Sequence, residues 1–459
     1  MGYRNINEKC AVIAISNSKD FDVARLAYLG LWSMQHRGQD SSGIASYDGI
    51  KIHIHKRSGL VSNVYNDEAL ANLRGRIAIG HNRYATTGGQ QESFNQPYEQ
   101  IDINFAFAHN GNIPHLDKLK NYAILNKLSI SGLNDSGLMG LALANELRKH
   151  NDIVMAVKLC WPLFTGAFSC VGLFKDKVFA FRDDHGIRPL SIAKSDHGYL
   201  VSSETVAADI IGADFYRDVE PGELIILKDD QIESFQIIQG SQKIDAFEFV
   251  YLARPDSVIS GISVYDSRHK MGETLAQSTT TKADIVIGVP DSGLPAAIGF
   301  SKVSGIPYEL GLLKNRYIGR TFIEPEKIRK SSLELKFNLI PGIVNGKDIV
   351  LIDDSLVRGN TLKHIIKILK SHGAKDIHVR IASPPVKFPD FYGIDTPKVN
   401  DLIAAEYTNE QILTIIGADS LDFISIDGLV SSIGLPIKQL CLSSFNGIYP
   451  ISVPKISQI

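Results

Sequence analysis

The segment Asp348–Thr361 constrains the fold more than any other part of this sequence. Four consecutive apolar residues after Asp348 predict a strand that is buried on both of its faces. Two carboxylates, Asp353 and Asp354, follow the strand, and a loop of small and polar residues comes next. Apolar residues then recur at helical spacing over 362–369, with lysines between them. The segment therefore predicts a strand, an acidic pair, a loop and a helix, in that order.

Each part of this segment has a chemical use. Small residues allow backbone N–H groups to close around a phosphate, and the N-terminus of a helix adds partial positive charge. Adjacent carboxylates accept hydrogen bonds from two neighbouring sugar hydroxyls, directly or through Mg²⁺. An acidic pair alone more often ends a strand and caps a helix. It is the complete string that favours a sugar-phosphate site.

The complete string resembles the phosphoribosyl-pyrophosphate signature of the type I phosphoribosyltransferases, with Asn360 where that family usually has Thr. The resemblance implies that the acidic pair holds the ribose hydroxyls and that the loop holds the 5-phosphate. The residues assigned in this way to phosphoribosyl pyrophosphate are Asp353, Asp354, Ser355, Val357, Arg358, Gly359, Asn360 and Thr361.

Composition narrows the class of protein. The chain has 459 residues, enough for two or three domains, and its 44% hydrophobic and 21% charged content is ordinary for a soluble globular protein. A net charge of −2 gives no reason to expect nucleic acid or a membrane as a partner. No apolar run approaches the ~18 residues of a membrane span, and four cysteines imply no disulfide framework. We expect a cytoplasmic protein.

Cys10 begins a second predicted strand, directly after the polar leader Met1–Lys9. A buried cysteine is more often a packing residue, but this position suggests chemistry. If the leader were removed, Cys10 would carry a free α-amino group, which titrates near pH ~7.7 and can act as general base for the thiol. We therefore predict an N-terminal nucleophile and a leader, residues 1–9, that is cleaved off.

Four motifs that follow resemble, together and in this order, the class II glutamine amidotransferase domain. They are Gln35–Ile44, Gly80–Gly88, Ala108–Asn112 and Asn134–Ser136. The resemblance implies that Arg83 binds the carboxylate of glutamine and that Asp135 binds its ammonium group. It also implies that Asn110 and the backbone N–H of Gly111 form the oxyanion hole for Cys10.

Two positions depart from the pattern of that family. Ala11 stands where Gly is common after the nucleophile, and Gly137 stands where Glu is common after the Asp-Ser pair. The first is expected to crowd the backbone beside Cys10, and the second to remove an acceptor near the glutamine ammonium group. Cys160 and Cys170 lie in apolar sequence and are predicted to be core residues.

A polar stretch, 228–243, predicts the join between two domains, and strands and helices alternate after it. That alternation predicts a parallel sheet with helices on both faces. The segment 284–293 is a strand followed by a small-residue loop, and the resemblance makes it the pyrophosphate loop. By the same resemblance, Ser292, Asp353 and Asp354 form the Mg²⁺ site, a role that suits magnesium because it bridges phosphate oxygens while keeping several waters.

The segment 314–322 is rich in basic and aromatic residues, and composition alone favours a solvated surface loop. The resemblance instead makes it the flexible catalytic loop, with Lys314, Arg316 and Tyr317 closing over the sugar phosphate. Some relatives hold a [4Fe–4S] cluster by four cysteines. The matching positions here are Ala246, Asp390, Cys441 and Ser444, so we expect no iron–sulfur cluster.

The two resemblances together cover nearly the whole chain from Cys10. In this combination of domains the chain resembles the glutamine phosphoribosylpyrophosphate amidotransferases. They imply an N-terminal-nucleophile glutaminase domain of four αββα layers over 10–235 and a type I phosphoribosyltransferase α/β domain over 246–459. Such an enzyme hydrolyses glutamine and passes the ammonia to C1 of phosphoribosyl pyrophosphate, the committing step of purine synthesis. The resemblance further implies inhibition by purine nucleotides and a homotetramer.

Three alternatives compete with this hypothesis. Glucosamine-6-phosphate synthase shares the glutaminase domain but lacks the phosphoribosyl signature. A regulator that senses phosphoribosyl pyrophosphate would usually bind nucleic acid, which the near-neutral charge does not favour. An enzyme that uses only ammonia is suggested by Ala11 and Gly137. Glutamine-dependent and ammonia-dependent synthesis distinguish these alternatives.

Overall fold

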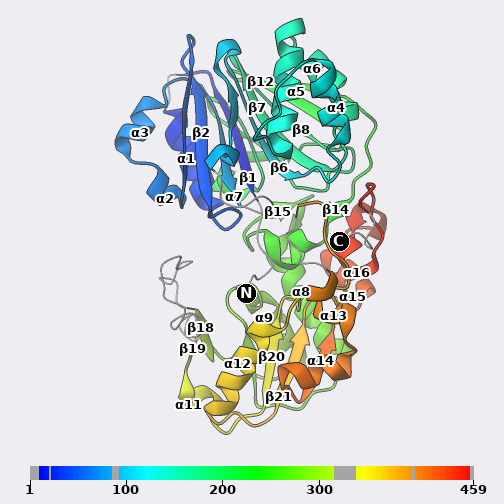
Figure 1. Cartoon of the computed structure of the whole chain (residues 1–459). Helices are drawn as coiled ribbons and strands as arrows, with labels where there is room; N and C mark the ends of the chain where they lie inside the picture. Colours follow the sequence, from blue (N-terminus) through cyan, green and yellow to red (C-terminus); the bar gives the residue numbers. More distant parts are fainter. Residues whose placement is uncertain (1–9, 20–21, 85–91, 315–336, 394–398, 455–459) are drawn as a thin grey trace.

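The chain folds into two lobes that lie end to end (Figure 1). The structure is a computed structural model that describes residues 10–19, 22–84, 92–314, 337–393 and 399–454. Within these ranges, every helix is too short or too polar to span a bilayer. The predicted leader, residues 1–9, and the catalytic-loop residues Arg316 and Tyr317 lie outside the described residues.

Two antiparallel sheets, stacked face to face, form the centre of the N-terminal lobe. The first has seven strands in the order β11-β9-β10-β1-β4-β2-β3, and the second has six in the order β13-β12-β8-β7-β6-β5. The strands of the first sheet are β1 (Ala11–Asn17), β2 (Ser41–Tyr47), β3 (Ile52–Ser58), β4 (Ile77–Arg83), β9 (Ser191–Ser195), β10 (Gly198–Ser202) and β11 (Asp214–Asp218). Those of the second are β5 (Tyr98–Gln100), β6 (Phe105–Asn112), β7 (Ala167–Phe174), β8 (Lys177–Arg182), β12 (Glu223–Lys228) and β13 (Gln231–Gln236).

Helices cover the outer face of each sheet in this lobe. Strand β1 shows why, because both of its faces are apolar: Val12 and Ala14 pack between the sheets, while Ile13 and Ile15 pack under the helices. The first sheet is covered by α1 (Val23–Ser33), α2 (Val61–Val64), α3 (Asp67–Asn72) and α7 (Val206–Ile211). The second is covered by α4 (Asp117–Leu125), α5 (Asp135–His150) and α6 (Ile153–Cys160). The predicted αββα layering is confirmed, and Cys160 and Cys170 are buried in its core as predicted.

A four-stranded parallel sheet forms the centre of the C-terminal lobe, in the order β17-β20-β21-β22. Its strands are β17 (Ile285–Gly288), β20 (Ile349–Asp353), β21 (Ile377–Ile381) and β22 (Ser420–Phe423). One face packs on α8 (Val264–Ser278), α9 (Leu294–Ser304) and α15 (Ile426–Ile433), and the other on α12 (Asn360–Ser371) and α14 (Asn409–Ile416). The predicted parallel sheet with helices on both faces is confirmed.

The smaller elements of the C-terminal lobe lie around this sheet. The paired short strands are β15 (Val258–Ile259) with β16 (Ile262–Ser263), β18 (Leu312–Lys314) with β19 (Phe337–Leu339), and β14 (Ile244–Asp245) with β23 (Leu440–Cys441). The short helices are a π-helical turn (Glu248–Leu252), α11 (Pro341–Val344), α13 (Ile403–Glu406) and α16 (Ser443–Asn446).

The join between the lobes begins later than the polar stretch 228–243 predicted. Strand β13 lies inside that stretch and pairs antiparallel with β12, Glu223 opposite Gln236. β13 is an edge strand with mostly exposed side chains, so it needs little of the apolar alternation that would reveal it in the sequence. The second sheet therefore continues to Gln236 before the chain passes to the C-terminal lobe.

Candidate active sites

Cys10 lies half-buried at the start of β1, in the first sheet. The neighbouring strand β4 runs antiparallel and places Asn82 opposite Ala11, so Arg83 at the end of β4 lies beside the start of β1. The side chain of Arg83 is only 5% exposed, and its guanidinium carbon lies 5.5 Å from the centroid of the Phe94 ring. The adjacent ends of β1 and β4 thus bring the predicted nucleophile and the predicted carboxylate-binding residue together.

The predicted oxyanion-hole residues lie at the end of β6, in the second sheet. Asn110 is fully buried, and its Nδ2 donates to Oγ of Ser203 at 3.3 Å. The same oxygen accepts from the backbone N–H of Val12 at 3.0 Å. Ser203 therefore ties Asn110 to the strand that begins after Cys10. Sequence reasoning missed this role of Ser203, because a Ser-Ser-Glu-Thr string carries no signal of a contact nearly a hundred residues away.

Gly111 occupies a position that no other residue fits. Its φ is +152°, and a Cβ added there would lie 2.0 Å from the carbonyl oxygen of Ala167 and 2.8 Å from Nε2 of His109. The close approach of β7 thus leaves room only for hydrogen. The backbone geometry at the predicted oxyanion hole is fixed by this packing.

Asp135 is the first residue of α5, where its charge is favoured by the helix dipole. Its Oδ1 accepts from the backbone N–H of Ser136 at 2.8 Å, and its Oδ2 accepts from that of Ile113 at 3.3 Å. Oδ2 also lies 3.8 Å from Nδ1 of His109. Burial lowers the pKa of His109, so this histidine stays neutral and leaves the carboxylate available for a cation.

The two departures from the family pattern are accommodated by the fold. The methyl group of Ala11 is fully buried in the cluster under α1. The backbone N–H of Gly137 donates to the side chain of the helix cap Asn134 at 3.0 Å. Neither position disturbs the strand or the helix that carries a predicted site residue.

The second candidate site is a cavity of about 810 Å³ between the two lobes. It is lined by Ser292, Lys314 and the whole acidic and phosphate-binding string from Asp353 to Thr361. The structure thus brings together every described residue that was assigned to phosphoribosyl pyrophosphate or to Mg²⁺. The cavity lies at the carboxyl ends of β17 and β20, where parallel α/β sheets commonly bind ligands.

The acidic pair is held in a fixed geometry. Asp353 Oδ1 accepts from the backbone N–H of Asp354 at 2.9 Å. Asp354 accepts from the hydroxyl groups of Ser292 and Ser355. Burial raises the pKa of Asp354, while these hydroxyls and the positive charge of Arg268 act in the opposite direction. The possible metal ligands here, the side chains of Ser292, Asp353 and Asp354, all present oxygen atoms.

The predicted phosphate loop ends at the N-terminus of α12. Gly359 has φ +76° and precedes the helix, so the first backbone N–H groups of α12 lie at the cavity wall. Arg358 donates from Nη2 to Asp401 Oδ2 at 3.1 Å, and Lys314 Nζ lies 3.0 Å from Asp291 Oδ2. The lysines of α12 are exposed, as its apolar spacing predicted.

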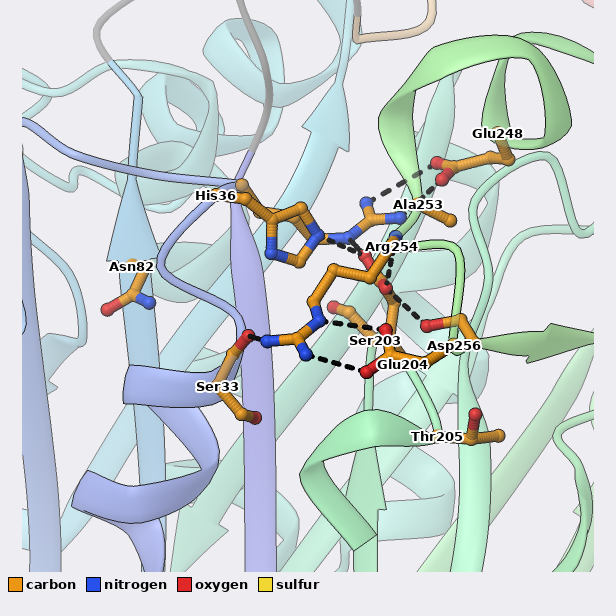
Figure 2. Close-up of polar contacts among 12 residues, drawn as sticks. Ser33, His36, Asn82, Ser203, Glu204, Thr205, Glu248, Ala253, Arg254 and Asp256 are labelled. Carbon is orange, nitrogen blue, oxygen red and sulfur yellow. Dashed lines mark hydrogen bonds and ion pairs between the residues drawn. The ribbon is translucent and has the colours of Figure 1, made fainter. Parts of the chain in front are cut away.

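Sequence reasoning missed the part of the cavity wall that lies opposite the phosphate loop. The N-terminal lobe contributes the end of α1 and the residues after it, and the C-terminal lobe contributes the segment 251–256 and Arg268. Figure 2 shows Arg254 between Ser33, Glu204 and Asp256. The strings that contain these residues were visible in the sequence, but nothing in them indicates that they meet across a lobe boundary.

Two of the four positions that match cluster ligands in some relatives are in direct contact in the structure. The backbone N–H of Ala246 donates to the carbonyl of Cys441 at 3.1 Å. Burial raises the pKa of the Cys441 thiol to about 12, and the charges of Asp245 and Asp390 act in the same direction. One thiol beside an alkyl group, a carboxylate and a hydroxyl is a poor donor set for an iron–sulfur cluster, which is held by four cysteine thiolates.

Comparisons with known proteins agree with this geometry. The sequence model of the phosphoribosyl transferase domain matches residues 262–384, and that of the glutamine amidotransferase domain matches residues 81–209. The amidophosphoribosyltransferase of Mycobacterium tuberculosis is 42% identical over 98% of this chain and 87% of its own length. That of Methanocaldococcus jannaschii is 40% identical over 97% of this chain and 98% of its own. The chain belongs to the amidophosphoribosyltransferase family.

A solved structure of the family extends the agreement to three dimensions. The glutamine phosphoribosylpyrophosphate (PRPP) amidotransferase from B. subtilis, complexed with ADP and GMP, matches with a TM-score of 0.90 and 38% identity. The match covers 97% of this chain and 98% of the other. The chain is thus an enzyme of the pentosyltransferase class, and the family and fold class inferred from the motifs are confirmed.

Proposed function

We propose that this protein makes 5-phosphoribosylamine, glutamate and pyrophosphate from glutamine, water and phosphoribosyl pyrophosphate, as the first step of purine synthesis. The observation that carries the proposal is the cavity between the lobes. It contains the complete phosphoribosyl-pyrophosphate string, and part of its wall belongs to the lobe that carries Cys10. A glutaminase site and a sugar-phosphate site in one chain suit a reaction that moves ammonia from one to the other.

The first half-reaction is glutamine hydrolysis. The Cys10 sulfur attacks the carboxamide carbon of glutamine, the C–N bond breaks with protonation of the leaving nitrogen, and water then hydrolyses the thioester to glutamate. Arg83 is suited to the α-carboxylate of glutamine because a guanidinium forms two parallel bonds with it. Asp135 at the start of α5 accepts from the α-ammonium group. Asn110 Nδ2 and the N–H of Gly111 stabilise the charge that develops on the carbonyl oxygen.

The second half-reaction is substitution at C1 of phosphoribosyl pyrophosphate. The lone pair of ammonia forms the C1–N bond, the bond from C1 to the pyrophosphate oxygen breaks with its electron pair, and the new amine loses a proton. Asp353 and Asp354 hold the ribose hydroxyls, and the N–H groups from Ser355 to Thr361 hold the 5-phosphate. Positioning and charge stabilisation supply most of the acceleration, and Lys314 adds positive charge near the departing pyrophosphate.

Magnesium fits the cavity. Within the part of the chain that the structure describes, no group of three or more His, Cys, Asp or Glu side chains gathers as a closed metal site. Two adjacent carboxylates and the Ser292 hydroxyl form an open, all-oxygen donor set, which suits an ion that keeps several waters and binds phosphate oxygens. Ser292, Asp353 and Asp354 would hold Mg²⁺, which when bound neutralises pyrophosphate charge.

Four further features belong to the proposal. The glutaminase domain spans 10–235 and the phosphoribosyltransferase domain spans 246–459. Purine nucleotides inhibit the enzyme, a proposal that the ADP and GMP in the complex of the B. subtilis relative support. The chain assembles as a homotetramer. Because Ala246, Asp390 and Ser444 offer no thiols beside Cys441, the enzyme works without an iron–sulfur cluster.

The leader 1–9 is cleaved to give a mature chain that begins with Cys10. An amide nitrogen accepts no proton, whereas the free α-amino group of a Cys10 released by cleavage can act as base for its own thiol. The test is the intact mass of active enzyme measured alongside its glutaminase rate. A species that keeps Met1–Lys9 and still hydrolyses glutamine at the full rate would contradict the free-amine mechanism.

The deciding experiment for the function compares two nitrogen donors. Purified enzyme is assayed for pyrophosphate release from phosphoribosyl pyrophosphate with glutamine and, separately, with ammonium chloride. We expect both donors to work in the wild type and only ammonia to work in Cys10→Ala. A wild type that uses ammonia alone would favour the ammonia-only alternative, and one that uses neither would refute the proposal.

A further inference from the structure

Strand β5 does not extend along the part of β6 that leads into the predicted oxyanion hole. The two strands pair antiparallel over residues 98–100 and 105–107. The same register would place Gln96 opposite His109, but Pro97 has no backbone N–H with which to continue the ladder. In an antiparallel ladder the N–H and C=O of one residue face the same neighbour. Both main-chain groups of His109 therefore need a partner other than a strand.

The side chain of Gln96 takes the place of the missing strand. Its Oε1 accepts from the backbone N–H of His109 at 2.7 Å, and its Nε2 lies 3.5 Å from the carbonyl oxygen of the same residue. The two residues are only 5% and 1% exposed, so these bonds form away from solvent. A carboxamide offers the same donor and acceptor as a peptide group. Gln96 thus holds β6 directly before Asn110.

The same carboxamide also reaches the helix that carries Asp135. Nε2 of Gln96 donates to Oγ of Ser136 at 3.2 Å, and Ser136 is the second residue of α5. Oγ of Ser136 lies 3.1 Å from Nδ1 of His109, whose Nε2 lies 3.4 Å from the carbonyl oxygen of Ala167. A carbonyl oxygen only accepts, so Nε2 of the neutral His109 carries the proton and Nδ1 accepts from the Ser136 hydroxyl. The start of α5 and the end of β6 are thus tied through Gln96.

Glutamine would lie across the two groups that this network joins. In the proposed function, Asp135 holds the α-ammonium group, and Asn110 with the N–H of Gly111 holds the carboxamide oxygen. Only two methylene groups separate the α-carbon from the carboxamide carbon, so a shift at one end of the ligand is passed to the other. The carboxamide carbon must lie about 3–3.5 Å from the Cys10 sulfur to react. The spacing between the two groups therefore matters for the rate.

We propose that Gln96 is a positioning residue of the glutaminase site, which sets the distance between the oxyanion hole on β6 and Asp135 on α5. This inference rests on the proposed function and deepens it, because it assigns a residue that holds the glutamine-binding groups without touching glutamine. The segment that carries Gln96 also carries Phe94, whose ring centroid lies 5.5 Å from the guanidinium carbon of Arg83. One short segment, 94–97, thus supports the groups for the carboxylate, the ammonium and the carboxamide of glutamine.

Three variants test the inference. Gln96→Met removes the carboxamide and keeps the length of the side chain, and Ser136→Ala removes only the connection to α5. Asn145→Leu is the matched control, because it removes a carboxamide from the same domain. Nδ2 of Asn145 donates to the hydroxyl of Tyr122 at 2.6 Å. Asn145 is in α5, about 15 Å along the helix axis from Asp135.

The measurement is glutamate release at increasing glutamine, together with pyrophosphate release with ammonium chloride as the nitrogen donor. In Gln96→Met we expect kcat for glutamine to fall about 10–100-fold and KM to rise, because a displacement of about 1 Å costs about a hundredfold. In Ser136→Ala we expect KM to rise about 2–10-fold while kcat stays within about threefold, because one hydrogen bond that supports substrate binding is lost. Asn145→Leu should keep both constants. All three variants should keep ammonia-dependent synthesis, whereas a residue that only stabilised the fold would change both activities in parallel.

Three results would overturn the inference while leaving the proposed function intact. One is a folded Gln96→Met enzyme whose kcat and KM for glutamine stay within about twofold of the wild type. Another is a loss of glutamine use in Asn145→Leu as large as that in Gln96→Met. If Gln96→Met fails to fold, Ser136→Ala decides, and an unchanged KM for glutamine is the third. A wild type that neither hydrolyses glutamine nor uses ammonia would instead refute the proposed function.

Discussion

Replacing Gly111 by Ala should sharply reduce glutamine use while sparing ammonia use. The added Cβ would lie 2.0 Å from the carbonyl oxygen of Ala167, whereas carbon and oxygen atoms in ordinary contact lie about 3.3 Å apart. The end of β6 must therefore move by roughly 1.3 Å relative to β7. Displacements of about 1 Å at a reacting group cost around a hundredfold in rate. Losing one oxyanion donor costs about 10²–10³ in kcat, so we expect glutaminase kcat to fall by that amount.

Stability should also fall, since overpacking costs about 1–3 kcal/mol and a positive φ at a non-glycine residue adds about 1 kcal/mol. Gly132→Ala is the matched control for the second effect. Gly132 has φ +74° in the same domain, with nothing within 4 Å of an added Cβ. We expect the Gly132→Ala variant to be about 1 kcal/mol less stable than the wild type and to keep its full glutaminase activity.

The assay measures glutamate release, ammonia-dependent pyrophosphate release and thermal unfolding for both variants. Gly111→Ala should keep ammonia-dependent synthesis, because the cavity residues lie in other elements. If Gly111→Ala hydrolysed glutamine within about threefold of the wild-type rate, the oxyanion assignment would be refuted. If both activities fell together in proportion to unfolding, Gly111 would be only a packing residue.

Three further predictions use the same assays. Asp354→Asn should reduce phosphoribosyl transfer by about 10–100-fold, from the loss of charge-assisted hydrogen bonds, while glutamine hydrolysis without phosphoribosyl pyrophosphate continues. A normal rate of transfer in this variant would refute the assignment of the acidic pair to the site. Arg83→Ala should raise the KM for glutamine by about 10–100-fold, from a lost bond of ~1.5–3 kcal/mol, and equal losses with ammonia would make Arg83 structural. Iron and acid-labile sulfide should be absent from purified enzyme, and about four irons per chain would contradict the reading of Ala246, Asp390 and Ser444.

Local sequence predicted the elements that carry the chemistry. The strand before Asp353 is apolar on both faces, which indicates a central strand of a parallel sheet, and the helix after Gly359 has the apolar spacing that the structure shows. Cys10 at the start of an apolar run likewise predicted β1. These signals are strong because burial on a sheet or under a helix selects residues at fixed spacing. The edge strand β13 is mostly exposed and carries little such signal, so its sequence predicts the join between the domains instead of a strand.

Only the tertiary structure decided which distant segments build the two sites. The hydrogen bonds from Asn110 to Ser203 and from Arg254 to Glu204 join segments separated by 93 and 50 positions in the chain. A serine or glutamate that finds its partner through folding has no periodic pattern, so its sequence surroundings do not reveal the contact. The interlobe cavity arises in the same way, because its wall forms only when the end of α1 packs beside Arg254. Sequence fixes which groups are present, and packing between the lobes determines which of them act together.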